Sequence, residues 1–216
     1  MGAEQPISDW AQSEEQLRCL AREKLHASPP VLESKGASDF DLNPGTETAG
    51  SGVQRRKAAV LIPVVLRETL SVILTMRTSH LTSHAGQIAF PGGKLDQGEG
   101  VLDTALREAE EEIGLSRSFV EPIGYLDWYR TRSGFLVSPV VAFIRPGFEI
   151  RGNPAEVDEV FEVPLSFLMD GANHATHQRQ VRGEVRSFYA MPYGERYIWG
   201  ATAGMIKNFY DKLRPE

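Results

Sequence analysis

Carboxylates gather on a stretch, residues 101–113, whose composition and spacing predict a helix. Glu108 and Glu112 stand one helical turn apart, and Glu111 lies beside both, whereas Glu110 points toward solvent. Like charges at these spacings destabilise a helix by roughly 0.2–0.5 kcal/mol per pair, and partial burial raises that cost. A hard divalent cation such as Mg²⁺ or Mn²⁺, which prefers oxygen ligands, is the simplest compensation.

One face of this helix is apolar, and Glu108 and Glu112 lie along its border. At about 100° per residue one face collects Leu102, Ala105, Leu106, Ala109 and Ile113. That face must pack on the domain, and the helix is expected to end at Gly114. The preceding residues 90–100 contain Pro91 and several glycines, which predicts a loop whose backbone can approach a ligand closely.

An acidic run alone is more typical of a solvated helix face than of a metal site. Here the run belongs to a longer pattern: Gly93, five residues, Glu99, seven residues, and then Arg107-Glu108-Ala109-Glu110-Glu111-Glu112-Ile113-Gly114-Leu115. This pattern resembles the signature of the Nudix hydrolases at every specified position. The resemblance implies an α/β class fold, an α/β/α sandwich around a mixed β-sheet, and hydrolysis of a diphosphate linked to another moiety with Mg²⁺ or Mn²⁺.

The resemblance also implies roles for individual residues. It implies that Glu108, Glu111, Glu112 and the backbone carbonyl of Gly92 bind the metal. Arg107 and Glu99 would hold the helix and its charges in place. The expected catalytic residues are Arg107, Glu108, Glu111 and Glu159. The general base stays open between Glu111, Glu156 and Glu159, and so does the number of metal ions.

The residues before the signature narrow the family. Residues 73–77, Gly86 and the block 84–93, which reads His-Ala-Gly-Gln-Ile-Ala-Phe-Pro-Gly-Gly, resemble the coenzyme A pyrophosphatase branch. That resemblance implies Arg77, Gly86 and Phe90 as substrate-binding residues. Arg132 joins them because its turn holds two arginines, although such a turn is as often solvent-facing.

Thr82 departs from the branch at a position where an arginine is expected. Coenzyme A carries a 3′-phosphate, and losing a fixed guanidinium removes charge-assisted bonds worth roughly 1.5–3 kcal/mol. Unless Arg77, Arg130, Arg132 or the cluster at 55–57 replaces it, the protein should discriminate weakly between coenzyme A and its 3′-dephospho form. In that case Thr82→Arg should raise the selectivity.

Two alternatives accompany the leading prediction, cleavage of coenzyme A or its thioesters to 3′,5′-ADP and 4′-phosphopantetheine or an acyl derivative. One is the same chemistry on another nucleotide, such as an ADP-sugar or a dinucleotide. The other is a Nudix-fold module that binds a nucleotide without cleaving it, which the complete set of signature acids disfavours. His80 and His84 stand in a polar stretch without a third ligand nearby, which favours a surface or substrate-loop role.

Composition limits the partners. The chain has 216 residues, is 41% hydrophobic and carries a net charge of -6, which disfavours nucleic-acid binding. Cys19 is the only cysteine, no apolar run is long enough to span a membrane, and the first ten residues do not resemble a secretory signal. We therefore expect a cytoplasmic enzyme with a small nucleoside diphosphate substrate and no nucleic-acid or membrane partner, and a homodimer is left open.

The signature and its flanking strands lie downstream of a distinct N-terminal part. Ser8 can cap a helix that runs to about residue 26, and residues 27–54 read as a linker or long loop rich in small and polar residues. The predicted division is therefore 1–54 for the helix and polar linker, and 55–216 for the Nudix domain. On this view, deleting residues 1 to about 50 should leave turnover within a few-fold.

Overall fold

The computed structural model describes residues 11, 13–31, 36–46, 55–79, 86–181 and 183–215. Ser8, His80, Thr82 and His84, which figured in the sequence predictions, lie outside these residues. No helix among the described residues is long and apolar enough to cross a membrane.

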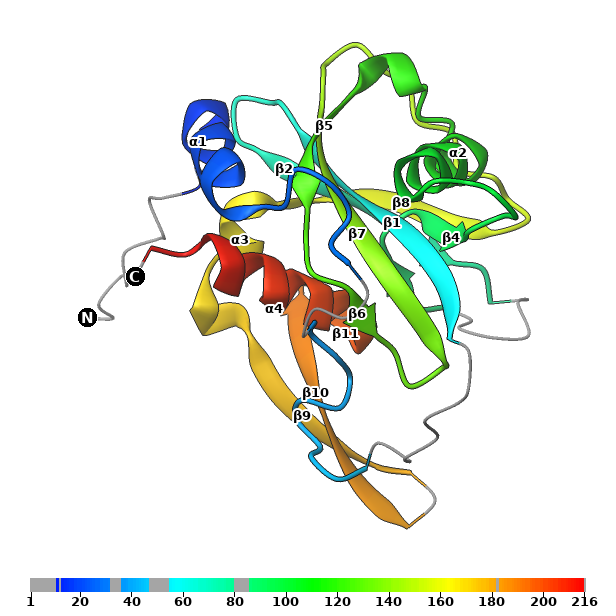
Figure 1. The fold of residues 1–216 in the computed structure, drawn as a ribbon, viewed down its shortest axis with the longest axis vertical. Coiled ribbons are helices and arrows are strands. Elements are labelled where there is room, and N and C mark those ends of the chain that lie inside the picture. The colour runs from blue at the N-terminus through cyan, green and yellow to red at the C-terminus, as the bar shows by residue number, and fades with distance from the viewer. Residues whose placement is uncertain are drawn as a thin grey trace.

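Eleven strands and four α-helices build the described part of the chain (Figure 1). The strands are β1 Arg56–Val65, β2 Ser71–Arg77, β3 Ile88–Ala89, β4 Gly92–Lys94, β5 Val120–Tyr125, β6 Tyr129–Arg130, β7 Phe135–Ile144, β8 Val157–Pro164, β9 Ala175–Val181, β10 Glu184–Tyr193 and β11 Arg196–Trp199. The helices are α1 Glu14–Lys24, α2 Val101–Ile113, α3 Leu165–Leu168 and α4 Ala201–Leu213.

The main sheet is mixed. Its strand order is β3-β2-β1-β7-β5, with β4 paired to β1, β6 to β7 and β8 to β2. Only β1 and β7 run parallel to each other, and the remaining pairs are antiparallel. A separate antiparallel sheet of order β11-β10-β9 extends below the main sheet in Figure 1.

Side chains alternate between the two faces of the main sheet, and each face is covered by helices. One hydrophobic cluster joins Ala59 and Leu61 of β1 to Ala105, Ala109 and Ile113 of α2. The other cluster joins the intervening residues of the same strands, such as Ile62 and Val64, to α1, α3 and α4. This arrangement confirms the predicted α/β/α sandwich around a mixed sheet.

Strand β1 lies in the middle of the sheet although it contains Pro63, a residue usually confined to edge strands and bulges. Pro63 pairs with Ala142 of β7 in an unbroken parallel register. On the other side of β1, pairing with β4 covers residues 58–60 and pairing with β2 covers residues 64–65. Pro63 lies between these two stretches, where a missing amide hydrogen interrupts neither ladder.

The N-terminal helix begins later than predicted. Ser13 caps α1: its hydroxyl accepts a hydrogen bond from the Gln16 backbone amide, and the Gln16 side-chain oxygen accepts one from the Ser13 backbone amide. Leu17 and Ala21 of this helix are buried in the hydrophobic cluster on the α4 face of the sheet. The helix is therefore packed into the domain.

Residues 36–46, predicted as part of a linker, are also bound to the domain. Asn43 clamps β10, because its amide group donates to the carbonyl of Ser187 and accepts from the Ser187 amide, both at 2.8 Å. Asp39 accepts hydrogen bonds from the Tyr129 hydroxyl and from the backbone amide of Arg132, also at 2.8 Å. This segment thereby connects β6 of the main sheet to the hairpin of β9 and β10.

Candidate active site

Arg107 holds the signature together. Its guanidinium forks onto Glu99, with Nε 2.9 Å from one carboxylate oxygen and Nη2 3.0 Å from the other. It also donates to Glu108 at 2.9 Å, to Glu111 at 3.1 Å and to the carbonyl of Lys94 at 3.2 Å. These charge-assisted bonds lower the pKa of Glu99 to about 2, with the guanidinium the largest cause and the Thr104 hydroxyl a smaller one.

Glu112 is the most deeply buried carboxylate of the helix, with 3% of its side chain exposed. It accepts hydrogen bonds from the backbone amide of Gly92 at 3.1 Å and from Arg77 at 3.2 Å. Burial outweighs both and raises its pKa from 4.5 to about 7. A shift of that size corresponds to roughly 3 kcal/mol against the charged form, so a nearby cation would be stabilising.

Glu108 lies directly against the glycine strand β4. A side chain on Gly93 would place its Cβ closer than 3.0 Å to the carboxylate of Glu108, and one on Gly92 would collide with the backbone of Val60 in β1. The pKa of Glu108 is raised, mainly by burial, and the charges of Glu111 and Glu156 add to the effect. The two glycines thus allow the strand, the helix and the carboxylate to approach one another.

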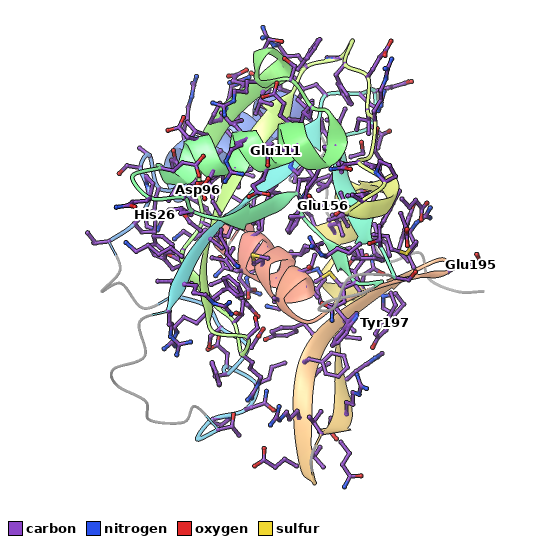
Figure 2. All side chains as sticks on the ribbon, turned by 90° about the vertical axis from the view of Figure 1, so that its right-hand side faces the viewer. His26, Asp96, Glu111, Glu156, Glu195 and Tyr197 are labelled. Atoms are coloured by element: carbon purple, nitrogen blue, oxygen red, sulfur yellow. The ribbon has the colours of Figure 1, made fainter. Side chains whose placement is uncertain are left out.

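Of the two candidate acids outside the helix, Glu156 is the one near the carboxylates. Its charge raises the pKa of both Glu108 and Glu112, and Figure 2 places it close beside the helix that carries Glu111. Glu159 instead forms an ion pair with Arg196. Its carboxylate is therefore engaged by a guanidinium, which makes it the weaker candidate for a general base.

No group of three or more His, Cys, Asp or Glu side chains converges in metal-binding geometry among the described residues. In this structure Arg107 holds Glu108 and Glu111, and Arg77 holds Glu112. The donor set nevertheless fits a hard divalent cation, because it offers carboxylate oxygens whose ionised forms are destabilised by burial and by mutual repulsion.

A cavity of about 850 Å³ begins at Gly92 and Gly93 and extends to the β9–β10 hairpin. Arg77 connects this cavity to the carboxylates of α2, because it lines the cavity and also contacts Glu112. Among the described lining residues six side chains are cationic and one, Asp39, is acidic. The cationic residues are Arg56, Arg77, Lys94, Arg132, Arg179 and Arg186. The cavity therefore suits a polyanionic ligand despite the negative net charge of the chain.

The predicted substrate-binding residues fall into two groups. Arg77, Phe90 and Arg132 line the cavity. Gly86 lies in a turn with φ of 67°, and its amide donates to the carbonyl of Arg77 at 3.0 Å. Since Gln87 beside it lines the cavity and Gly86 is not among the lining residues, the contribution of Gly86 is to shape the turn.

Sequence reasoning missed the cavity wall contributed by the second sheet. Arg179, Arg186, Phe188 and Trp199 line the cavity. The sequence held a signal for the two arginines, because counting outward from a turn at Gly183 pairs residue 181 with 184 and residue 179 with 186. That the hairpin lies over this cavity could not be read from the same pattern.

Comparison with known proteins shows the family of this chain. A family profile described as NUDIX domain matches residues 55–183, and the chain therefore belongs to the Nudix hydrolase family. A protein from Photorhabdus laumondii subsp. laumondii, named Uncharacterized Nudix hydrolase NudL, is 40% identical over 160 residues, covering 74% of this chain and 86% of that protein. The protein of the same name from Escherichia coli O1:K1 / APEC is 40% identical over 157 residues, covering 72% and 82%.

Among solved structures, the NUDIX domain of Shewanella oneidensis NrtR complexed with ADP ribose matches with a TM-score of 0.47 and 16% identity. The match covers 78% of this chain and 95% of that chain. Membership of the family makes the chain a Nudix pyrophosphohydrolase that acts on a nucleoside diphosphate derivative, and enzymes of this family use divalent metal ions.

The contact between Gly93 and Glu108 predicts the effect of a single methyl group. In Gly93→Ala the new Cβ must displace the Glu108 carboxylate, which is the end of a flexible side chain, so the fold should survive. We expect a loss of about 10²-fold in kcat, because misplacing a catalytic group by about 1 Å has costs of this order. Steady-state kinetics and thermal unfolding check this, with Gly100→Ala as the control, because its new Cβ would meet only the end of the flexible Asp103 side chain, at 3.2 Å. Unchanged kcat in Gly93→Ala would contradict the assigned contact.

Proposed function

We propose that this enzyme hydrolyses the diphosphate bond of coenzyme A and acyl-coenzyme A, giving 3′,5′-ADP and 4′-phosphopantetheine or its acyl derivative. The observation that carries the proposal is the block at residues 84–93, which resembles the coenzyme A pyrophosphatase branch and leads directly into the site. The cavity supports the proposal, since its cationic lining begins at the signature and continues to the aromatic side chains Phe188 and Trp199. Its volume of about 850 Å³ is large enough for a nucleotide.

The residues have distinct tasks in this proposal. Glu108, Glu111, Glu112 and the carbonyl of Gly92 would hold the divalent cation, Mg²⁺ or Mn²⁺. Such a cation, when bound, neutralises the diphosphate and lowers the pKa of a coordinated water. Arg107 orients Glu108 and Glu111 while its fork onto Glu99 keeps its own position constant.

Substrate binding and proton transfer involve the residues around the carboxylates. Arg77 is placed to contact the diphosphate from the cavity side, next to Glu112. Glu156 and Glu111, the latter with 56% of its side chain exposed, are the bases that we favour, since both are accessible acceptors near the acidic helix. As a base, Glu111 would leave its 3.1 Å contact with Arg107 and would not serve as a metal ligand. Glu159 is the third candidate, and its ion pair with Arg196 would have to open first.

A hydrolysis panel tests the substrate. We expect kcat/KM for coenzyme A or an acyl-coenzyme A to exceed the values for ADP-ribose, NADH and nucleoside triphosphates by at least about 10-fold, which corresponds to about 1.4 kcal/mol of transition-state discrimination. Product masses should identify cleavage within the diphosphate. Preference for ADP-ribose or a dinucleotide would replace coenzyme A by another nucleotide, and binding without turnover of any compound would contradict hydrolysis itself.

A further inference from the structure

Two arginines face each other across the β9–β10 hairpin. Arg179 and Arg186 are direct partners in the antiparallel register, so their side chains share one face of the sheet. Both line the cavity described above. Like charges placed directly opposite each other destabilise a hairpin. A group that binds between them would offset that cost.

Neither guanidinium is neutralised by a buried partner. Arg186 contacts Glu184 at 3.2 Å, but 64% of the Glu184 side chain is exposed, so water screens this pair. The Nε of Arg186 is buried and has no hydrogen-bond partner among the described residues. Arg179 makes no ion pair within the same part of the chain. The buried donor of Arg186 and the exposed guanidinium of Arg179 are therefore both available to a ligand at this wall.

Aromatic side chains continue the same face. Phe188 lies two residues after Arg186, and Trp199 pairs with Ala190 in the register of β10 and β11. Their ring centroids are 5.4 Å apart in an edge-on arrangement, and both line the cavity. Guanidinium forks beside exposed ring faces are the combination that binds a phosphorylated nucleoside, with the phosphate on arginine and the base on an aromatic ring.

The remainder of the wall adds positive charge. Arg132 lines the cavity from the turn before β7, and its guanidinium is held over the Phe40 ring at 4.6 Å and by the Thr46 hydroxyl at 2.7 Å. Asp39, the acidic lining residue, accepts from Tyr129 and from the Arg132 amide. Its carboxylate is therefore engaged in a local network that leaves the hairpin arginines uncompensated.

We propose that Arg179 and Arg186 form a subsite for a phosphate monoester of the nucleotide substrate, with Phe188 and Trp199 beside it to stack the base. This inference rests on the proposed function, in which the monoester is the 3′-phosphate of coenzyme A. The subsite would replace the guanidinium that the coenzyme A motif places at position 82. Thr82→Arg should then change the selectivity between coenzyme A and 3′-dephospho-coenzyme A by less than about 3-fold.

A binding measurement tests this subsite independently of catalysis. Calorimetric titration of the full chain with 3′,5′-ADP and with 5′-AMP, without divalent cation, should show at least about 10-fold tighter binding of 3′,5′-ADP. The double variant Arg179→Gln/Arg186→Gln should abolish this difference. Arg151→Gln, which removes one positive charge at a position that is 83% exposed, should preserve the difference. Inorganic phosphate as a third ligand shows whether the arginines bind the anion without the nucleoside.

Steady-state kinetics of the double variant are the second test of the subsite. For the double variant we expect KM for coenzyme A to rise about 10- to 100-fold with kcat unchanged, and KM for 3′-dephospho-coenzyme A to change little. Arg179→Lys/Arg186→Lys should restore part of the affinity. Equal affinity of the wild type for 3′,5′-ADP and 5′-AMP, or equal losses for both substrates in the double variant, would overturn the subsite. If the wild type cleaves neither coenzyme, the proposed function fails, while the titration still decides whether the subsite exists.

Discussion

Replacing Glu108 or Glu112 of α2 by glutamine should nearly abolish turnover. For Glu108→Gln and Glu112→Gln we expect kcat to fall about 10²- to 10⁴-fold with saturating Mg²⁺, because each removes a charge that would hold a cation whose stabilisation of the transition state is worth several kcal/mol. The assay is hydrolysis of the best substrate of the panel, with metal binding followed separately by titration of Mn²⁺.

Glu110→Gln is the matched control. Glu110 lies between the two acids in sequence, but its side chain is 52% exposed and its nearest cationic partner, Arg117, is 3.7 Å away. We expect its kcat to stay within about 2-fold of wild type, as is usual for an exposed ion pair. Glu112→Gln should not lower the melting temperature, since burial already disfavours the charged form of Glu112. Equal losses in all three variants would contradict the assignment of a metal site.

Deleting residues 1–46 should destabilise the enzyme strongly. The packing argues against the expectation that this segment is dispensable, because α1 contributes Leu17 and Ala21 to the core and residues 36–46 connect β6 to β10. Leu17 is fully buried, so Leu17→Ala alone should cost about 2–5 kcal/mol of unfolding free energy. The deletion should cost at least as much, as measured by urea unfolding.

Glu15→Ala in the same helix is the control, because Glu15 is exposed and should change stability by less than about 0.5 kcal/mol. An unchanged urea midpoint after the deletion would show that the N-terminal packing contributes nothing. Asn43→Ala tests the second contact separately, since it removes the clamp on Ser187 and leaves α1 intact. If the hairpin position matters mainly for substrate binding, this variant should raise KM while its urea midpoint stays close to that of the wild type.

The sequence alone determined the elements whose signals are local. Helix α2 spans Val101–Ile113 as predicted and ends at Gly114 with φ of 69°, because the apolar period and a glycine that tolerates a left-handed backbone both act within a few residues. The apolar runs in β1, β2 and β7 and the amphipathic period of α4 are local signals of the same kind. The contact of Arg107 with Glu111 also follows from helical spacing, because the two residues are four apart.

Only the tertiary structure decided which distant residues meet. Arg77 reaches Glu112, and Asp39 reaches Arg132, across separations in sequence that no periodic pattern encodes. The same holds for the pairing of Glu159 with Arg196 and for the hairpin arginines at the cavity wall. Such contacts depend on how the two sheets pack and on the burial that this packing creates. The residue types therefore identified the chemistry, whereas the pKa of Glu112 and the cationic lining of the cavity arise only when the layers assemble.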